Sequence, residues 1–178
     1  MPKTAPTPWN KGRTLPAEPL TPHEALALLS ACSSKAPTGL RNRALLTLLW
    51  RGGLRVAESL ALLPKDVDPE AGTVRVLRGK GSKARTVGLD PTAMAVVQRW
   101  VDRRRELGIK GRAPLLCTLK GKPLHSSYCR ALLPRLARKA EILKRAHPHG
   151  LRPMLSSLCG SVCRCRSSAA SLVIPASQ

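Results

Sequence analysis

The sequence predicts a mostly α-helical domain with a small antiparallel β-sheet, an α+β fold class, and two observations carry that prediction. Apolar residues recur at helical spacing in several segments of the chain. Residues 73–77 instead alternate between apolar and polar side chains, and a glycine-rich turn separates them from a second short alternating segment at 85–87. With 178 residues and 43% hydrophobic content, the chain is long enough for one domain with its own core.

The N-terminal part is expected to be an arm followed by a helix. Residues 1–19 contain five prolines and several basic residues, a composition typical of a flexible basic arm. Order is expected to begin at Thr21, because Thr-Pro-His-Glu combines an N-cap residue, a first-turn proline and a capping-box glutamate, Glu24. The expected apolar face of this helix consists of Ala25, Leu26 and Leu29.

Four further helices are expected, over residues 40–51, 54–62, 91–107 and 126–140. The pair Gly52-Gly53 separates the first two of them, and Pro91 suits the first turn of the third. Residues 66–72 are expected to form a turn that leads into the first strand. The expected buried positions of these helices include Ala44, Leu45, Leu48, Leu49, Val56, Leu60, Leu63, Met94, Val97 and Val101.

The charge balance is extreme for a chain of this size. Lysine and arginine number 31 against 10 acidic residues, which gives a net charge of +21. Such a field attracts polyanions, so DNA or RNA is favoured as the partner. Aromatic residues make up 2% of the chain, which favours contacts with duplex phosphates over base stacking on single strands. The alternative is a basic protein kept soluble by self-repulsion.

Other classes of protein are disfavoured by what the sequence lacks. No segment has the apolar run of a membrane span or a signal peptide, so we expect a cytoplasmic protein with no membrane partner. In that compartment the six cysteines are expected to stay reduced, and their spacing gives no disulfide framework. His147 and His149 lack carboxylate or thiolate neighbours at a recognisable ligand spacing, so neither a metal nor another cofactor is expected.

The first candidate motif is Gly-Leu-Arg-Val-Ala-Glu at residues 53–58. Arg55 follows the glycine break at the start of a helix, a place where a rigid backbone can aim a guanidinium at a phosphate. The alternative is a surface arginine paired with Glu58 three residues later, a contact worth about a few tenths of a kcal/mol. We favour Glu58 as a buttress that orients Arg55 rather than as a base.

The second motif, Gly-Lys-Gly-Ser-Lys-Ala-Arg at residues 79–85, covers the expected hairpin turn. Its glycines permit a close approach to DNA, where Lys80 can neutralise phosphate charge or give a proton to a leaving oxygen. The alternative is an exposed turn lysine, and the spacing is not that of a Walker P-loop. Arg78, Lys83 and Arg85 are expected to contact backbone phosphates.

The third motif is His-Gly-Leu-Arg at residues 149–152. His149 and Arg152 stand three residues apart, so they share one face of a helical turn. Histidine offers a proton donor near neutral pH, and arginine offers a bidentate clamp for a phosphate.

In this order, with a helix before the first and a strand around the second, the three motifs resemble the catalytic domain of the tyrosine recombinase (phage integrase) family over about residues 20–152. The resemblance implies that Arg55 and Arg152 are the active-site arginines, Lys80 the hairpin lysine and His149 the histidine of H-x-L-R. The family uses these groups around a tyrosine that attacks the scissile phosphate and forms a 3′-phosphotyrosyl link, without a metal. Integration and recombination of double-stranded DNA are therefore expected, and homo-oligomers on that DNA are compatible with it.

The chain departs from this family after Arg152. Its single tyrosine, Tyr128, precedes the His149 motif, so the family's order does not identify it as the nucleophile. Residues 153–178 contain no His, Tyr, Asp or Glu, and we expect them to be a disordered, aberrant tail rather than a zinc module. A truncated and catalytically inactive protein is expected.

A change of reading frame would explain this tail. Residues from Pro153 onward can be back-translated with freely chosen synonymous codons and read from the third base of the Pro153 codon. They then give HAFIFVRERVPLPVISRQLGHSSIA, which continues the H-x-L-R motif with the family-like R-H-A-F and R-Q-L-G-H-S-S-I. We therefore expect a frameshift after Arg152, and the restored string still ends before the expected tyrosine.

Two other function classes remain open. A non-catalytic accessory protein would bind specific DNA without phosphotyrosyl chemistry. A basic RNA-binding or ribosome-associated protein would bind without regard to the geometry of Arg55, Lys80 and Arg152. Convergence of those three groups on one concave basic surface would favour the recombinase class.

Overall fold

The computed structural model describes residues 19–77 and 84–151, with the backbone alone described at His149. Its helices are α1 (Pro22–Ala31), α2 (Pro37–Trp50), α3 (Val56–Ala61), α4 (Pro91–Glu106) and α5 (Ser126–Lys139), with short 3₁₀ helices η1 (Pro64–Asp66) and η3 (Pro148–Leu151). Its strands are β1 (Val67–Asp68), β2 (Thr73–Val76) and β3 (Arg85–Gly88). The predicted α+β class is confirmed. The predicted arm before residue 19, the hairpin turn and the tail at 153–178 lie outside the described residues.

Helix α1 begins where the capping signals predict. The Thr21 hydroxyl accepts a bond from the Glu24 amide at 3.2 Å, and the Glu24 carboxylate accepts one from the Thr21 amide at 2.7 Å. Its buried face contains Ala25 and Leu28, whereas Leu26 is 51% exposed. The prediction for Leu26 is therefore wrong, because the helix turns positions 25 and 28 toward the core and leaves 26 in solvent.

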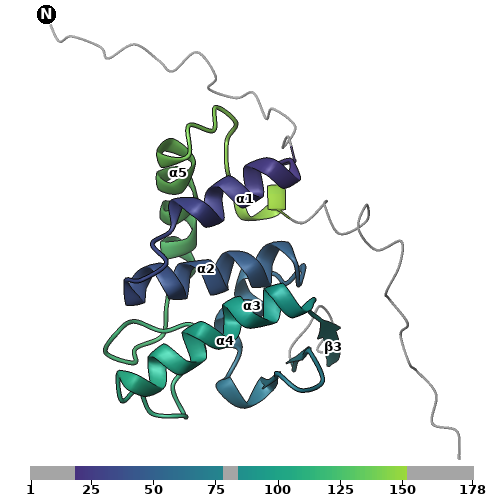
Figure 1. Ribbon diagram of the computed structural model, residues 1–178, viewed down its shortest axis with the longest axis vertical. Helices are drawn as coiled ribbons and strands as arrows, with labels where there is room; N and C mark the ends of the chain where they lie inside the picture. Colours follow the sequence, from purple (N-terminus) through teal and green to yellow (C-terminus); the bar gives the residue numbers. More distant parts are fainter. Residues whose placement is uncertain (1–18, 78–83, 152–178) are drawn as a thin grey trace, which may run out of the picture.

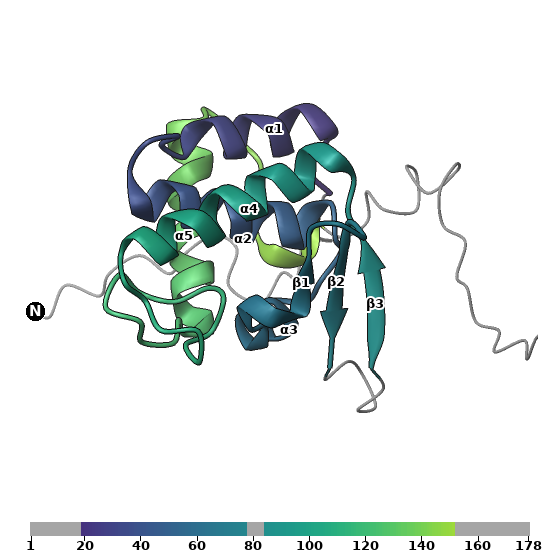
Figure 2. The same cartoon turned by 60° about the horizontal axis from the view of Figure 1, so that its bottom comes forward.

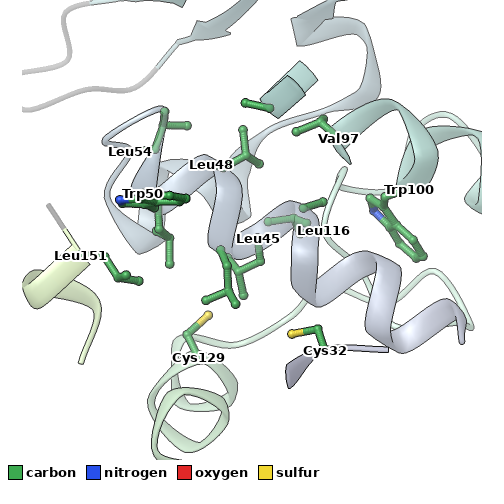
Figure 3. Close-up of a cluster of buried hydrophobic side chains, with 14 of the residues drawn as sticks. Cys32, Leu45, Leu48, Trp50, Leu54, Val97, Trp100, Leu116, Cys129 and Leu151 are labelled. Carbon is green, nitrogen blue, oxygen red and sulfur yellow. The ribbon is translucent and has the colours of Figure 1, made fainter. Parts of the chain in front are cut away.

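Helix α2 forms the centre of the core. It begins at Pro37 rather than at residue 40, and its predicted apolar positions Ala44, Leu45, Leu48 and Leu49 are all at most 1% exposed. Helix α4 runs beside it (Figure 1) and buries Trp100, whose indole N–H donates to the Leu115 carbonyl at 2.7 Å. Figure 3 shows Leu45 and Leu48 between Val97 of α4 and Cys129 of α5. The helices therefore share one core.

Arg104, near the end of α4, is a buried cation that bonds to backbone carbonyls. Its side chain is 3% exposed and donates to the carbonyl oxygens of Lys110, Ala113 and Pro114 at 3.1–3.3 Å. These bonds offset the burial of the guanidinium and fix the loop that returns from α4 toward the core. No helix in the described part of the chain is long and apolar enough to cross a membrane.

The sheet is antiparallel in the order β1-β2-β3. Thr73 pairs with Gly88 and Val76 with Arg85, which confirms the predicted hairpin. Strand β1 forms inside the segment predicted as a turn, where Val67 pairs with Val74. Figure 2 shows the three strands at one end of the helical body, with α3 beside them. The start of β3 can therefore reach α3.

Candidate active site

Arg55 stands at the N-terminus of α3, after a tight turn that follows α2. Gly53 has a φ of 57°, in the left-handed region that favours glycine. A Cβ added at Gly52 would lie 2.8 Å from the carbonyl oxygen of Leu48. Leu54 is fully buried, and its amide donates to that same carbonyl at 3.1 Å. The turn therefore fixes the backbone from which the Arg55 guanidinium projects.

Glu58 lies in the first turn of α3 and joins two arginines. Its side chain is 4% exposed. One oxygen, Oε1, accepts bonds from Arg55 Nη1 and Arg85 Nη1, each at 2.9 Å. The other, Oε2, accepts from the Arg55 amide and from Arg85 Nη2, each at 2.8 Å. The carboxylate therefore caps α3 and ties it to the first residue of β3.

These contacts hold Glu58 in its charged form. The bonds from Arg85 lower the pKa of the Glu58 carboxyl most, burial opposes them, and the bonds from Arg55 add to the lowering, so that the pKa falls to about 2. The same pair raises the pKa of the Arg85 guanidinium. Glu58 is therefore an anion near neutral pH. A buttress for Arg55 fits this state, and a general acid does not.

The cluster keeps an excess of positive charge at the surface. Two guanidinium groups share one buried carboxylate, which leaves one net positive charge. The side chains of Arg55 and Arg85 remain 39% and 36% exposed. An anion that approaches from solvent therefore meets the positive charge of two guanidinium groups that Glu58 already orients, an arrangement suited to a phosphate.

The structure brings together Arg55, Glu58 and Arg85 among the predicted site residues. Lys80, Lys83, Arg78 and Arg152 lie outside the described residues. His149 belongs to η3, which packs against α2 and α5, and its side chain is not described. Convergence of all the predicted groups on one face therefore remains a prediction.

Tyr128 has a structural environment of its own. Its hydroxyl accepts a bond from Arg41 Nη2 at 2.6 Å and donates one to Asn42 Oδ1 at 2.9 Å. The Arg41 guanidinium carbon also lies 4.9 Å from the centre of the tyrosine ring, and a further Arg41 nitrogen donates to the Cys117 carbonyl at 3.2 Å. The hydroxyl thus satisfies buried polar groups of α2.

Sequence reasoning missed two of these partnerships. The pairing of Arg85 with Glu58 crosses 27 positions, and the bond from Arg41 to Tyr128 crosses 87. One available signal was the pair Arg41-Asn42 in a helix whose buried positions are mostly apolar, since buried polar residues need partners.

Metal binding and thiol chemistry find little support among the described residues. They contain no group of three or more His, Cys, Asp or Glu side chains arranged to hold a metal ion. The thiols of Cys32, Cys117 and Cys129 are buried and free, and burial raises the pKa of Cys32 to about 11. Their enclosure among apolar side chains suits core packing rather than nucleophilic chemistry.

The fold of this chain is that of the tyrosine recombinase catalytic domains. The chain belongs to the phage integrase family, which matches residues 18–159. It is 35% identical over 145 residues to the tyrosine recombinase XerC of Xanthomonas axonopodis pv. citri, covering 82% of this chain and 46% of that protein. XerD of Ralstonia nicotianae is 36% identical over 141 residues, with 77% and 46% covered. The chain thus spans about half the length of these relatives.

Solved structures agree with this assignment. XerA recombinase superposes with a TM-score of 0.70 at 26% identity, covering 88% of this chain and 54% of that one. XerH, a site-specific recombinase crystallised with its difH substrate, gives a TM-score of 0.66 at 27% identity, covering 83% and 44%. The lambda integrase catalytic core, at 20% identity, shares the fold with a TM-score of 0.60, covering 79% of this chain and 82% of that core.

Proposed function

We propose that this chain is a DNA-binding member of the site-specific recombinases that holds a backbone phosphate of duplex DNA at Arg55. The observation that carries the proposal is the Arg55–Glu58–Arg85 cluster, in which a buried carboxylate orients an arginine at a helix N-terminus. The net charge of +21 supports a polyanionic partner. A cytoplasmic location is part of the same proposal.

The remaining predicted residues complete this proposed site. Lys80, His149 and Arg152 join Arg55 around the scissile phosphate, as the family resemblance implies. In a phosphoryl transfer, preorganised donors of this kind stabilise the charge that grows on the phosphorane oxygens. Arg78 and Lys83 contact neighbouring phosphates, and the exposed part of Arg85 adds positive charge beside them.

Helix α5 supplies a second basic surface that suits the same partner. It contains no Asp or Glu, and its exposed positions include Arg130, Arg135, Arg138 and Lys139. With basic residues on both α5 and the Arg55 cluster, several copies of the protein can bind along one DNA duplex.

Strand cleavage is not part of the proposed activity of this sequence. Its single tyrosine, Tyr128, is bonded through its hydroxyl to Arg41 and Asn42, so its oxygen is engaged within the fold. The arginines can stabilise charge but supply no attacking oxygen. We further propose that a frameshift after Arg152 replaced the family's C-terminal sequence, which the nucleotide sequence around codon 153 tests directly.

Duplex binding is tested by fluorescence anisotropy with labelled DNA and RNA duplexes between about 50 and 200 mM salt. We expect DNA affinity to fall steeply with salt through counterion release, and Arg55→Ala to weaken it about tenfold. Binding that hardly responds to salt contradicts the proposal, and a clear preference for RNA favours the ribosome-associated class instead.

Catalysis is tested with suicide DNA substrates that trap a covalent protein–DNA adduct. We expect no adduct from the present sequence, and adduct formation after the frame is restored from codon 153 and extended to include a tyrosine. An adduct that survives Tyr128→Ala would reveal another nucleophile. An adduct that Tyr128→Ala abolishes would show that Tyr128 is itself the nucleophile.

A further inference from the structure

Arg85 lies against Glu58 in the geometry of a bidentate ion pair. Its two terminal nitrogens donate to the two carboxylate oxygens at 2.9 and 2.8 Å. The carboxylate is 4% exposed and the guanidinium 36%. Two parallel charge-assisted bonds fix the plane of a carboxylate, which a single bond cannot do.

The same carboxylate also receives both bonds from Arg55. Oε1 accepts from Arg55 Nη1 and Arg85 Nη1, while Oε2 accepts from the Arg55 amide and Arg85 Nη2. A carboxylate has about four acceptor positions, so all of them are in use. Any rotation of the Glu58 carboxylate away from Arg85 would therefore also displace its bond to the Arg55 guanidinium.

The position of Arg85 in the sheet makes it a rigid anchor for this carboxylate. It is the first residue of β3 and pairs with Val76 of β2. Glu58 belongs to a six-residue helix, and Arg55 precedes that helix as its N-cap. The ion pair therefore connects a short helix and its N-cap arginine to a paired strand.

We propose that Arg85 is a positioning residue, which acts through Glu58 to hold the Arg55 guanidinium in the orientation that receives a DNA phosphate. This inference rests on the proposed function of Arg55. In this role the two terminal nitrogens of Arg85 bind Glu58 rather than DNA. The planar, fork-shaped guanidinium, with its two parallel donors, is then essential as well as the positive charge.

Substitutions that separate fork shape from charge test this role in duplex binding by anisotropy. Arg85→Lys keeps the charge but cannot form the bidentate pair, so we expect it to weaken binding about tenfold, nearly as much as Arg85→Ala. Glu58→Gln should weaken binding similarly, and Arg85→Ala should add little in the Glu58→Gln background. The matched control is Arg75→Ala, an exposed arginine on the adjacent strand, which removes one charge and should have a small effect.

Two outcomes of this assay would overturn the role. The first is wild-type affinity in Arg85→Lys together with a loss in Arg85→Ala, because that pattern describes a simple charge contact with phosphate. The second is simple addition of the losses from Arg85→Ala and Glu58→Gln in the double variant, since independent contributions contradict action through Glu58.

A second readout needs no DNA. The pKa of Glu58 is measured by NMR from the pH dependence of the chemical shift of its carboxyl carbon. The wild-type protein is compared with the folded Arg85→Lys variant, and Arg75→Lys is the control. We expect the Glu58 pKa to rise from about 2 in Arg85→Lys and to stay low in the control. An unchanged Glu58 pKa overturns the role of Arg85 even if DNA binds. A wild-type protein that binds no DNA overturns the proposed function, whereas this titration still tests the coupling of Arg85 to Glu58.

Discussion

Glu58 is the residue on which the candidate site depends, because a single buried carboxylate orients two guanidinium groups. Its pKa in the folded protein is about 2, compared with 4.5 for an ordinary glutamate. Folding therefore favours the ionised form. The resulting stabilisation is fully present above about pH 5 and is lost as the pH falls through the range from 4.5 to 2.

The pH dependence of stability checks this electrostatic role. We expect Glu58→Gln to lower the free energy of unfolding by about 2 to 3 kcal/mol at pH 7, and the difference from wild type to shrink toward about pH 2.5. Urea unfolding of both proteins across this range provides the measurement. The pKa of Glu24 is also lowered, by Thr21, but Glu24 is present in both proteins and its effect cancels. A difference that does not vary with pH would contradict the assignment.

Tyr128 offers a second residue-scale prediction, because its hydroxyl bonds two polar side chains of α2. Tyr128→Phe keeps the ring beside Arg41 but removes the acceptor for its Nη2 and the donor to Asn42. We expect a loss of stability of about 1 to 2 kcal/mol in urea unfolding. Arg130→Ala, on the exposed side of the same helix, is the control and should change stability little. Equal stability of wild type and Tyr128→Phe would refute a structural role for the hydroxyl.

At the scale of elements, the turn between α2 and α3 determines where Arg55 projects. Gly52 leaves no room for a side chain, since its Cβ would meet the Leu48 carbonyl oxygen and Leu54 Cδ1, each at 2.8 Å. We expect Gly52→Ala to cost on the order of 2 kcal/mol and to weaken duplex binding, because the backbone that carries Arg55 must move. Gly88→Ala in β3 is the control, since nothing lies within 4 Å of its added Cβ. Thermal unfolding and anisotropy of both variants provide the check.

The elements that the sequence predicts well are those with local signals. The capping box at Thr21 and the alternation that became β2 each lie within a few residues, so the start of α1 and the hairpin could be predicted. Strand β1 has two residues, too few to alternate, and it exists through pairing with β2. Helix α2 buries even Arg41 and Asn42, so periodicity alone did not describe its surroundings.

In the candidate site, too, the local contact could be predicted from the sequence and the long-range contact could not. Arg55 and Glu58 are three residues apart, and their bond could be predicted from helical spacing. The bonds from Arg85 depend on how the sheet lies against α3, which no local pattern encodes. Sequence reasoning therefore predicted a phosphate contact for Arg85 but could not reveal that both terminal nitrogens of this side chain bind the Glu58 carboxylate.

Over the whole molecule, the fold must accommodate a large excess of positive charge. The chain has 31 basic residues and 10 acidic ones, so an excess of 21 basic side chains has no acidic counterpart in the sequence. Repulsion among them opposes the compact state. Salt reduces this repulsion, because the screening length falls from about 30 Å at 0.01 M to about 10 Å at 0.1 M.

Opposite responses of stability and binding to salt follow from this charge. We expect the Tm of the free protein to rise between about 10 and 300 mM NaCl, as repulsion is screened, while affinity for duplex DNA falls over the same range. A fixed concentration of duplex should therefore raise Tm strongly at low salt and hardly at all at high salt, because the stabilisation by a ligand grows with the logarithm of its concentration relative to Kd. KCl at matched ionic strength controls for ion identity. A Tm of the free protein that falls as NaCl increases would show that attractive ion pairs, such as those of Glu58, outweigh the net repulsion.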